Sequence, residues 1–403
     1  MRAIIAGGGI GGLTLALSLY ARGIPSIICE AARTIRALGT GINLLPHAVS
    51  ELAELDLLQG LVDIGIETRE LRYLNRFGQQ IWVEPRGIWA GNTVPQISIH
   101  RGRLHNLLWN AAVERLGPSG VLPGMRMIRA SQDAYGVRVE FENGTGLEGD
   151  ILIGCDGIHS ALRQTIHPID KGIRWNGVQM WRGSVDWPMF EGGDMMIVAG
   201  GMDAKLVLYP IAKCPVDANR LTNWVVTARI GTQNDPPPRR EDWSRLGDLN
   251  ELLPHAALFN IPFVDVQALV SATPEFWEYP MCDRDPLPRW TDGLFTLLGD
   301  AAHAMYPVGS NGASQAILDA RFLADQLASL SPRDALLSYE AERLPRTAEI
   351  VQINRSGGPE RVIDVVSHRA PNGFAHIDDV ISRSELDAIA KGYAQMTQST
   401  NPH

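Results

Sequence analysis

Apolar positions near the start of the chain fall in two short runs separated by a helix-like segment. In RAIIAGGGIGGLTLALSLYARGIPSIICEAA, Ala3–Ala6 form the first run, and the second spans Ser26–Cys29 and ends in Glu30. Between them, Leu13–Arg22 carry the spacing of a buried helix. The pattern predicts a strand, a glycine-rich turn, a helix and a second strand.

The rest of the chain alternates between helical and strand-like patterns. Helical periodicity is found in three further segments: residues 43–62, 101–117 and about 312–329. Short strands are predicted within residues 66–100 and around 125–130, 136–141 and 151–155. Between about residues 174 and 281 the sequence becomes rich in tryptophan. It contains strand-like runs such as MMIVAG, KLVLYPI and TNWVVTARI, which predict an antiparallel sheet. The last part of the chain is expected to be helical.

The first turn carries a glycine fingerprint. Residues 7–12 fit G-x-G-x-x-G directly after a strand and at the start of a helix. Gly7 allows a tight turn, Gly9 lets the backbone approach a pyrophosphate, and Gly12 allows the helix to pack closely on the strand. Glu30 ends the next strand, where its carboxylate can hold a ribose. These features predict dinucleotide binding and leave NAD and FAD open.

Composition and charge exclude several other classes of protein. The 403 residues are 45% hydrophobic and 20% charged, which is ordinary for a globular protein and suits two domains. A net charge of −9 argues against nucleic acid as a partner, because phosphate binding needs a basic surface. The four cysteines include no CxxC pair, so we expect neither a metal site nor disulfides, and a cytoplasmic location fits. No apolar window is long enough to predict a membrane span.

Two later motifs each place a glycine beside an aspartate. ILIGCDGIHSALR runs from a strand into Asp156-Gly157 and then to a helix capped by Ser160. LFTLLGDAAH ends a strand in Gly299-Asp300, and a P-x-G-x-x-G segment follows at residues 307–312. With the N-terminal fingerprint, the chain resembles the single-component FAD-dependent aromatic hydroxylases related to para-hydroxybenzoate hydroxylase over nearly its full length.

Within that family the chain is most similar to the phenazine-modifying flavin hydroxylases, of the 5-methylphenazine-1-carboxylate 1-monooxygenase type. The segments that carry this closer resemblance are WVEPRG, SIHRG, MWRG, NWV, YPMCDRDPLPRW and MYPVGSNGASQAILD. The resemblance implies an α/β fold with a Rossmann-like FAD-binding domain, an inserted, mainly antiparallel β-sheet domain for the substrate, and C-terminal helices. The expected boundaries are residues 1–70, 98–173 and 282–355 for the first, 71–97 and 174–281 for the second, and 356–403 for the helical segment.

The resemblance also implies a site for non-covalently bound FAD. The residues that it assigns to the cofactor are Gly7, Gly9, Ile10, Gly11, Gly12, Glu30, Arg36, Gly41, Ile42, Arg101, Asp156, Arg163, Gly299, Asp300, Pro307, Gly309, Asn311 and Gly312. Asp300 would accept hydrogen bonds from the ribityl hydroxyls. The helix that begins near Gly309 to Gly312 would point its N–H groups at the anionic end of the reduced isoalloxazine ring.

The implied reaction uses NADH or NADPH and O₂ as co-substrates. Reduced FAD forms a C4a-hydroperoxyflavin, whose distal oxygen hydroxylates an aromatic or heteroaromatic ring, with decarboxylation where the ring carries a carboxylate. The substrate is expected to be phenazine-like or carboxylated, and the protein a monomer or homodimer. Because the flavin carries the chemistry, no metal is expected, and no protein residue is identified as the catalytic acid or base.

Candidates for the substrate pocket come from the predicted sheet and from the flavin side. They are Trp181, Arg182, Tyr209, Trp224, Met305, Tyr306 and Pro307. Flat aromatic walls suit a flat substrate, and the planar fork of Arg182 could bind a carboxylate or phenolate. A tryptophan in a strand is equally at home in a hydrophobic core. An alternative function is a non-hydroxylating FAD-binding oxidoreductase, or a flavin-binding sensor or scaffold, which would show no NAD(P)H oxidation stimulated by aromatic compounds.

Overall fold

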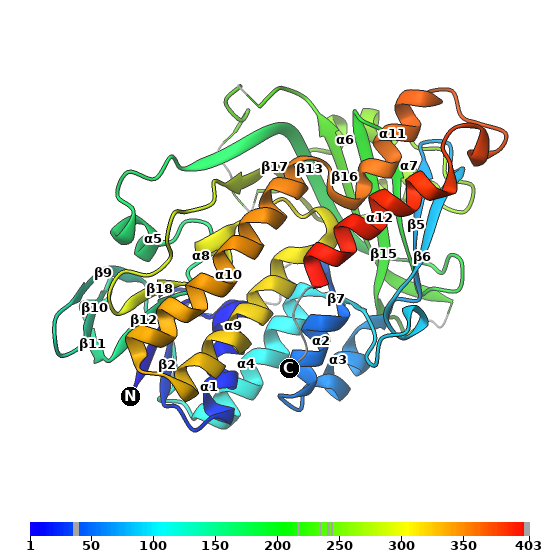
Figure 1. The fold of residues 1–403 in the computed structure, drawn as a ribbon. Helices are drawn as coiled ribbons and strands as arrows, with labels where there is room; N and C mark the ends of the chain where they lie inside the picture. Colours follow the sequence, from blue (N-terminus) through cyan, green and yellow to red (C-terminus); the bar gives the residue numbers. More distant parts are fainter. Residues whose placement is uncertain (35–39, 216–217, 234, 240–241, 243–244, 399–403) are drawn as a thin grey trace.

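The structure is a computed structural model of the 403-residue chain (Figure 1). It describes residues 1–34, 40–215, 218–233, 235–239, 242 and 245–398, with side chains described up to residue 390. None of the helices within these ranges combines the length and the apolar composition that a membrane crossing requires.

A five-stranded parallel sheet holds the N-terminal strand at its centre. Its strands, in spatial order, are β18 (Phe295–Leu297), β12 (Ile151–Gly154), β1 (Ala3–Ala6), β2 (Ser26–Glu30) and β8 (Val121–Pro123). All four residues of β1 and all four of β12 are buried, because the sheet is covered on both faces. This burial explains why the parallel strands are short, continuous apolar runs in the sequence.

Helices cover this sheet. They are α1 (Ile10–Ala21), α2 (Pro46–Ala53), α3 (Leu58–Ile64), α4 (Arg101–Leu116), α5 (Ala161–Ile166), α8 (Asp300–His303), α9 (Asn311–Ser329) and α10 (Pro332–Arg355). Figure 1 shows α1, α9 and α10 side by side, and α9 contacts both of the others. The N-terminal helix and a helix from residues beyond 310 therefore share one packed layer.

A seven-stranded sheet forms the second layer. Its spatial order is β17 (Phe276–Arg284), β13 (Ile173–Pro188), β16 (Asn219–Arg229), β15 (Ala204–Lys213), β14 (Met195–Gly200), β5 (Glu70–Asn75) and β6 (Gln80–Pro85). All neighbours are antiparallel except β14 and β5, which run parallel. Two stretches far apart in sequence thus complete one sheet.

The two faces of this sheet have different coverings. Helices α6 (Leu249–Ala256) and α7 (Val266–Ser271) lie with Trp181, Trp224, Val226 and other side chains in one hydrophobic cluster. The other face contributes Tyr73, Met196, Val198 and Tyr209 to a second cluster, which also contains buried residues of the C-terminal helices α11 (Arg361–Arg369) and α12 (Arg383–Gln398). The alternation of side chains along a strand produces this division.

Short elements complete the fold. They are the antiparallel sheet of β9 (Met127–Gln132), β10 (Val137–Phe141) and β11 (Gly146–Gly149), the small sheet of β3 (Gly41–Leu44), β7 (Ile97–His100) and β4 (Ile66–Glu67), and the 3₁₀ turns η1 (Gly87–Ala90), η2 (Val308–Ser310), η3 (Gly358–Glu360) and η4 (Ile377–Asp379). The parallel sheet, the mainly antiparallel sheet and the C-terminal helices confirm the predicted fold class.

Candidate functional site

A continuous cavity of about 1640 Å³ lies between the two large sheets. Its walls come from the segments that follow β1, β12 and β18, from the first turn of α9, and from one face of the seven-stranded sheet. A single small-molecule site usually occupies roughly 300–1,000 Å³. The cavity therefore has room for two ligands in contact with each other.

The glycine-rich turn after β1 forms one wall of the cavity. Gly7 has a φ of +114°, and a Cβ at this position would lie 2.2 Å from the carbonyl oxygen of Cys155. A Cβ at Gly12 would lie 2.1 Å from the carbonyl oxygen of Gly7. Gly9 lines the cavity, and a Cβ there would meet nothing within 4 Å. Two of the glycines permit close packing, and the third faces open space.

Helix α1 begins at this turn with its N–H groups available for a ligand. Its N-cap residue, Gly9, provides no side-chain cap, and its first turn contains no acidic residue. Ile10 and Gly11 line the cavity beside it. The positive end of a helix and its unpaired N–H groups form a site for an anionic group such as a pyrophosphate.

Glu30 supports the turn from behind and is not among the residues that line the cavity. Its carboxylate accepts hydrogen bonds from the N–H groups of Gly8 and Ala32, both at 2.7 Å. His105 lies on the other side, with Nε2 2.6 Å from the carbonyl oxygen of Gly8. Sequence reasoning did not select His105, although it lies one helical turn after Arg101 in α4, which was predicted to contact the cofactor.

Of the two residues predicted from the second motif, Asp156 lines the cavity and Arg163 lies outside its lining. Asp156 lines the cavity, and its Oδ2 accepts from the N–H of Ala161 at 2.7 Å. Its Oδ1 is buried and has no hydrogen-bond partner among the described residues, and burial raises the pKa of this carboxyl. Arg163 does not line the cavity. It is 1% exposed and donates to the carbonyl oxygens of Ala301 and Ala302 at 3.2 and 3.1 Å.

The turn after β18 places a carboxylate in the same cavity. Gly299 has a φ of +63°, so a residue with a side chain would be strained there. Asp300 follows as the first residue of α8 and lines the cavity with an exposed side chain. Because β1, β12 and β18 are parallel and in register at Ala6, Gly154 and Leu297, their carboxyl ends bring this turn beside the glycine-rich one.

The segment 307–312 brings a second helix N-terminus to the cavity. Pro307, Gly309, Asn311 and Gly312 all line it. Gly309 and Ser310 have φ values of +68° and +60°, a backbone conformation that ordinary side chains rarely adopt. Helix α9 then starts without a side-chain cap or an acidic residue in its first turn. Its N–H groups are therefore available to an electronegative group.

The seven-stranded sheet contributes a mixed polar and aromatic face. Along β13, the cavity side carries Asn176, Val178, Met180 and Arg182, which alternate with residues of the opposite face. Five aromatic side chains line the cavity: Tyr73, Trp82, Tyr209, Trp277 and Tyr279. Met305 lines it from the segment after α8. This wall suits a flat aromatic ligand.

Arg182, on β13, is a charged group on this face. It donates through Nη2 to the carbonyl oxygen of Gly41 at 2.6 Å and through Nη1 to the hydroxyl of Tyr279 at 3.0 Å. Its Nε is buried without a hydrogen-bond partner among the described residues, within which no carboxylate forms an ion pair with it. Burial raises the pKa of the nearby Tyr209 to about 12, although Arg182 lowers it, so this phenol stays protonated at neutral pH.

Comparison with known proteins supplies the family. Residues 1–354 match the profile described as an FAD binding domain. The chain belongs to this FAD-binding family.

Named relatives of the family are aromatic hydroxylases. The chain is 45% identical over 362 residues to phenazine 1,6-dicarboxylic acid hydroxylase PhzS of Lysobacter antibioticus, covering 87% of this chain and 88% of the relative. It is 34% identical over 375 residues to 3-amino-4-hydroxybenzoate 2-monooxygenase PtnB3 of Streptomyces platensis, covering 89% and 88%. The crystal structure of Klebsiella pneumoniae HpxO with FAD and uric acid has the same fold, with a TM-score of 0.74, 23% identity and coverage of 99% and 93%.

These matches confirm several predictions from the sequence. The resemblance to FAD-dependent aromatic hydroxylases is confirmed, as are FAD as the cofactor and the enzyme class of FAD-dependent monooxygenases. The roles of individual residues are a separate matter, because they depend on where this chain places each side chain.

The described residues fit an FAD molecule along one wall of the cavity. Two uncapped helix N-termini, at Gly9 and Gly312, face it with nothing within 4 Å of either added Cβ. Asp300 and Asp156 line the same cavity, and Oδ1 of Asp156 has no hydrogen-bond partner among the described residues. One helix end for the pyrophosphate, carboxylates that can accept from the ribityl hydroxyls and a second helix end for the electronegative edge of the ring match the order of groups along FAD.

Three residues predicted to line the substrate pocket, Trp181, Trp224 and Tyr306, do not line the cavity, so these predictions are wrong. Trp224 is fully buried and donates to Thr273 at 2.8 Å, and Trp181 stacks on His255, both on the sheet face opposite the cavity. Tyr306 is 4% exposed and does not line the cavity. Strand alternation explains Trp181, since its neighbour Arg182 points into the cavity. Gly7 and Gly12 provide the tight turn and the close packing predicted for them, and Glu30 and Arg163 do not line the cavity.

The segment before β3 holds the remaining candidates. Gly41 and Ile42 line the cavity, and the N–H of Gly41 donates to the buried Oδ1 of Asn223 at 2.7 Å. Arg101, at the start of α4, lines the cavity with an exposed side chain. Arg36 lies outside the described residues.

Proposed function

We propose that this protein hydroxylates an aromatic or heteroaromatic compound, using bound FAD, NADH or NADPH, and O₂. The observation that carries the proposal is the one continuous cavity that joins two helix N-termini and Asp300 to a sheet face with aromatic walls and Arg182. The relatives named above act on aromatic acids, aminohydroxybenzoate and phenazine dicarboxylate among them, which supports this class of substrate.

We also propose which parts of the chain bind FAD and which bind the substrate. Residues 1–70, 98–173 and 282–355 would bind FAD, and residues 71–97 and 174–281 would bind the substrate. The C-terminal segment 356–403 would close the substrate side, since Glu360 and Asp364 from it line the cavity. The state of assembly, monomer or homodimer, and a cytoplasmic location stay predictions.

The chain's own residues would bind and orient the cofactor. The N–H groups of α1 beside Gly9 would hold the pyrophosphate, and Asp300 would accept from the ribityl hydroxyls. The first turn of α9 would face the electronegative edge of the ring. Bound FAD supplies hydride acceptance and the activation of O₂, so no side chain is required as a nucleophile.

The sheet face would orient the substrate. Arg182 lines the cavity, and no carboxylate among the described residues pairs with it, so an anionic group on the ring, a carboxylate or a phenolate, would pair with its guanidinium group. Tyr209, held protonated, can donate a hydrogen bond beside it. The apolar residues Met196, Val198 and Val207 would keep water from the reacting ring. We infer a substrate that is phenazine-like or carboxylated.

The decisive experiment begins with the flavin spectrum of the purified protein. Phenazine carboxylates, other aromatic acids and quinolines are then screened for stimulated oxidation of NADH and NADPH under ¹⁸O₂, with mass spectrometry of the products. Stimulated oxidation with one ¹⁸O atom in the product supports the proposal. Flavin-loaded protein that no ring compound stimulates would instead be a non-hydroxylating flavoprotein or sensor.

A paired variant tests the placement of the cofactor. Asp300→Ala should release FAD more readily than wild type, because this exposed carboxylate lines the cavity and would accept from the ribityl hydroxyls. Asp292→Ala serves as the control, since this half-exposed aspartate lies in the turn before β18 and does not line the cavity. Equal flavin content in both variants would contradict the role given to Asp300.

A further inference from the structure

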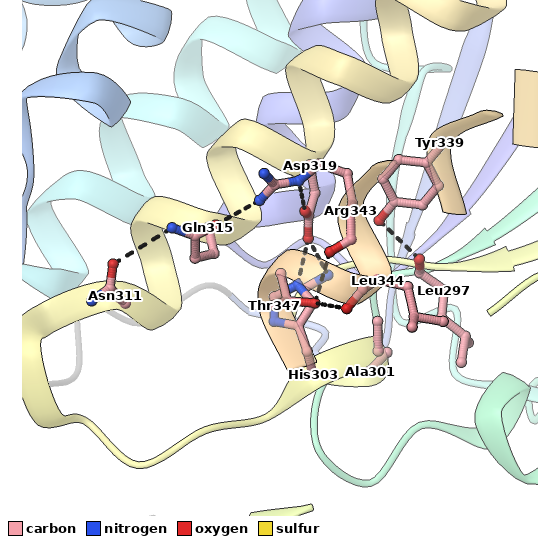
Figure 2. A network of polar contacts seen from close by, with 12 residues as sticks. Leu297, Ala301, His303, Asn311, Gln315, Asp319, Tyr339, Arg343, Leu344 and Thr347 are labelled. Carbon is pink, nitrogen blue, oxygen red and sulfur yellow. Dashed lines mark hydrogen bonds and ion pairs between the residues drawn. The ribbon is translucent and has the colours of Figure 1, made fainter. Parts of the chain in front are cut away.

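A chain of buried polar side chains joins three helices behind the cavity wall (Figure 2). Asp319 on α9 lies at its centre and is 0% exposed, with Arg343 of α10 and His303 of α8 each 3% exposed. Gln315 and Asn311, one and two turns before Asp319 on α9, are buried as well. Polar groups at such positions are uncommon in a protein interior.

Each member has a specific partner. Asp319 accepts from Nε of Arg343 at 2.8 Å through Oδ1, and its Oδ2 lies 2.5 Å from Nε2 of His303. Arg343 also donates through Nη2 to Oε1 of Gln315 at 2.6 Å. The amide of Gln315 then donates to Oδ1 of Asn311 at 3.5 Å. Figure 2 shows these contacts as one path from His303 to Asn311.

Both ends of the path reach the cavity wall. The N–H of Gly299 donates to Oδ2 of Asp319 at 3.3 Å, so the turn that presents Asp300 is tied to the carboxylate. At the other end, Asn311 lines the cavity and donates to the carbonyl oxygen of Gly309 at 3.1 Å. Asp319 and Arg343 therefore connect the Gly299–Asp300 turn to the first turn of α9.

Stability alone is a weak reason for this arrangement. Buried ion pairs lose much of their attraction to desolvation, and well-packed apolar residues often stabilise a fold as much. Burial would raise the pKa of Asp319, but His303 and Arg343 lower it, so the carboxylate stays charged. The buried Nδ1 of His303 has no hydrogen-bond partner among the described residues. The directed bonds of Asp319 and Arg343 fix the position of the backbone around them.

We propose that Asp319, Arg343 and Gln315 are positioning residues that hold the Gly299–Asp300 turn and the first turn of α9 in one geometry, and thereby set the preference of the site for reduced over oxidised FAD. The inference rests on the proposed function only in requiring bound FAD. The N–H groups at the start of α9 favour negative charge, and the reduced flavin is anionic. A small displacement of this turn weakens the binding of reduced FAD more than that of oxidised FAD.

The test compares the midpoint potential of bound FAD in three variants, by equilibration with a reference dye. Gln315→Met removes an uncharged link and leaves the Arg343–Asp319 ion pair in place. Asp319→Asn weakens the centre of the path. Arg346→Met is the matched control, because this partly exposed arginine lies on the same helix α10 and pairs with Glu342. Unfolding of each apoprotein is followed by circular dichroism.

We expect Gln315→Met and Asp319→Asn to lose at least tenfold in their preference for reduced FAD. For a two-electron couple this loss lowers the potential by about 30 mV. Arg346→Met should keep the wild-type potential. A wild-type potential in flavin-loaded Gln315→Met and Asp319→Asn, or the same fall in Arg346→Met, overturns the inference and leaves the network as helix packing.

The outcome separates this inference from the proposed function. The potential is measured without an aromatic substrate, so a flavin-loaded wild type that never hydroxylates refutes the proposed function alone. Hydroxylation with unchanged potentials in Gln315→Met and Asp319→Asn refutes the positioning role alone. A wild-type chain that binds no FAD refutes both.

Discussion

Replacing Gly9 with alanine should separate cofactor binding from folding. Gly9 has φ −75° and ψ −177°, a conformation open to any residue, and an added Cβ meets nothing within 4 Å. Alanine reduces the entropy of the unfolded chain, a gain of about 0.4–1 kcal/mol, and is a poorer N-cap than glycine by a similar amount. The two effects offset each other, so the free energy of unfolding of apoprotein should change by less than about 1 kcal/mol.

The same methyl group stands in the cavity in front of the N–H groups of α1. Losing one hydrogen bond to a charged group costs about 1.5–3 kcal/mol. Since about 1.4 kcal/mol corresponds to a factor of ten in affinity, the Kd for FAD should rise about 10- to 150-fold. Flavin fluorescence measures the Kd, and thermal denaturation of apo and FAD-loaded protein measures the two stabilities.

Two further glycines provide the comparison. In Gly12→Ala the new Cβ would lie 2.1 Å from the carbonyl oxygen of Gly7, so the apoprotein itself should lose about 1–3 kcal/mol of stability. Gly146→Ala, on β11 and outside the cavity, has its nearest atom at 3.5 Å, so it should leave the Kd unchanged and alter the free energy of unfolding by no more than about 1 kcal/mol. A Gly9→Ala protein that binds FAD within threefold of wild type would refute the assignment of α1 as the pyrophosphate site.

Three other substitutions test the substrate side of the cavity and the hydrophobic cluster beneath α6 and α7. Arg182→Met should raise KM for a carboxylated aromatic compound at least tenfold with FAD content unchanged, and an equal rise for its uncharged amide would argue against an anion subsite. The pKa of Lys205 would be lowered by burial, but the neighbouring carboxylates of Glu360 and Asp364 raise it above its usual value. This ion pair therefore stabilises the protein fully below the unfolded pKa of about 10.4 and progressively less as pH rises through the higher folded value. Urea denaturation should show that loss in wild type and not in Lys205→Met; the same alkaline slope in both would exclude Lys205 as its source. Trp224→Ala should lower the free energy of unfolding by about 3–5 kcal/mol while the folded protein keeps its FAD affinity, and weakened FAD binding would contradict its place on the far face of the sheet.

The sequence determined the convergence of the three glycine and aspartate motifs. Each follows a short apolar run, and such runs predict buried parallel strands. The carboxyl ends of parallel strands meet at one edge of a sheet, so the pattern predicts residues 7–12, Asp156 and Asp300 at that edge, and the family resemblance implies that they lie close together. The glycine pattern also fixed where backbone could approach a ligand, because Gly7 and Gly12 leave no room for a side chain.

Only the tertiary structure decided which side of each element faces the cavity. Alternation in MWRG puts Trp181 and Arg182 on opposite faces, but it does not say which face α6 and α7 cover. Arg163 was predicted to bind the cofactor, yet it pairs with Asp170 and donates to the carbonyl oxygens of Ala301 and Ala302 in α8. The network around Asp319 was also hidden, since its partners come from three helices. The burial and the hydrogen-bond partners of a side chain depend on which other segment packs against it, and the sequence of a single segment does not specify that segment.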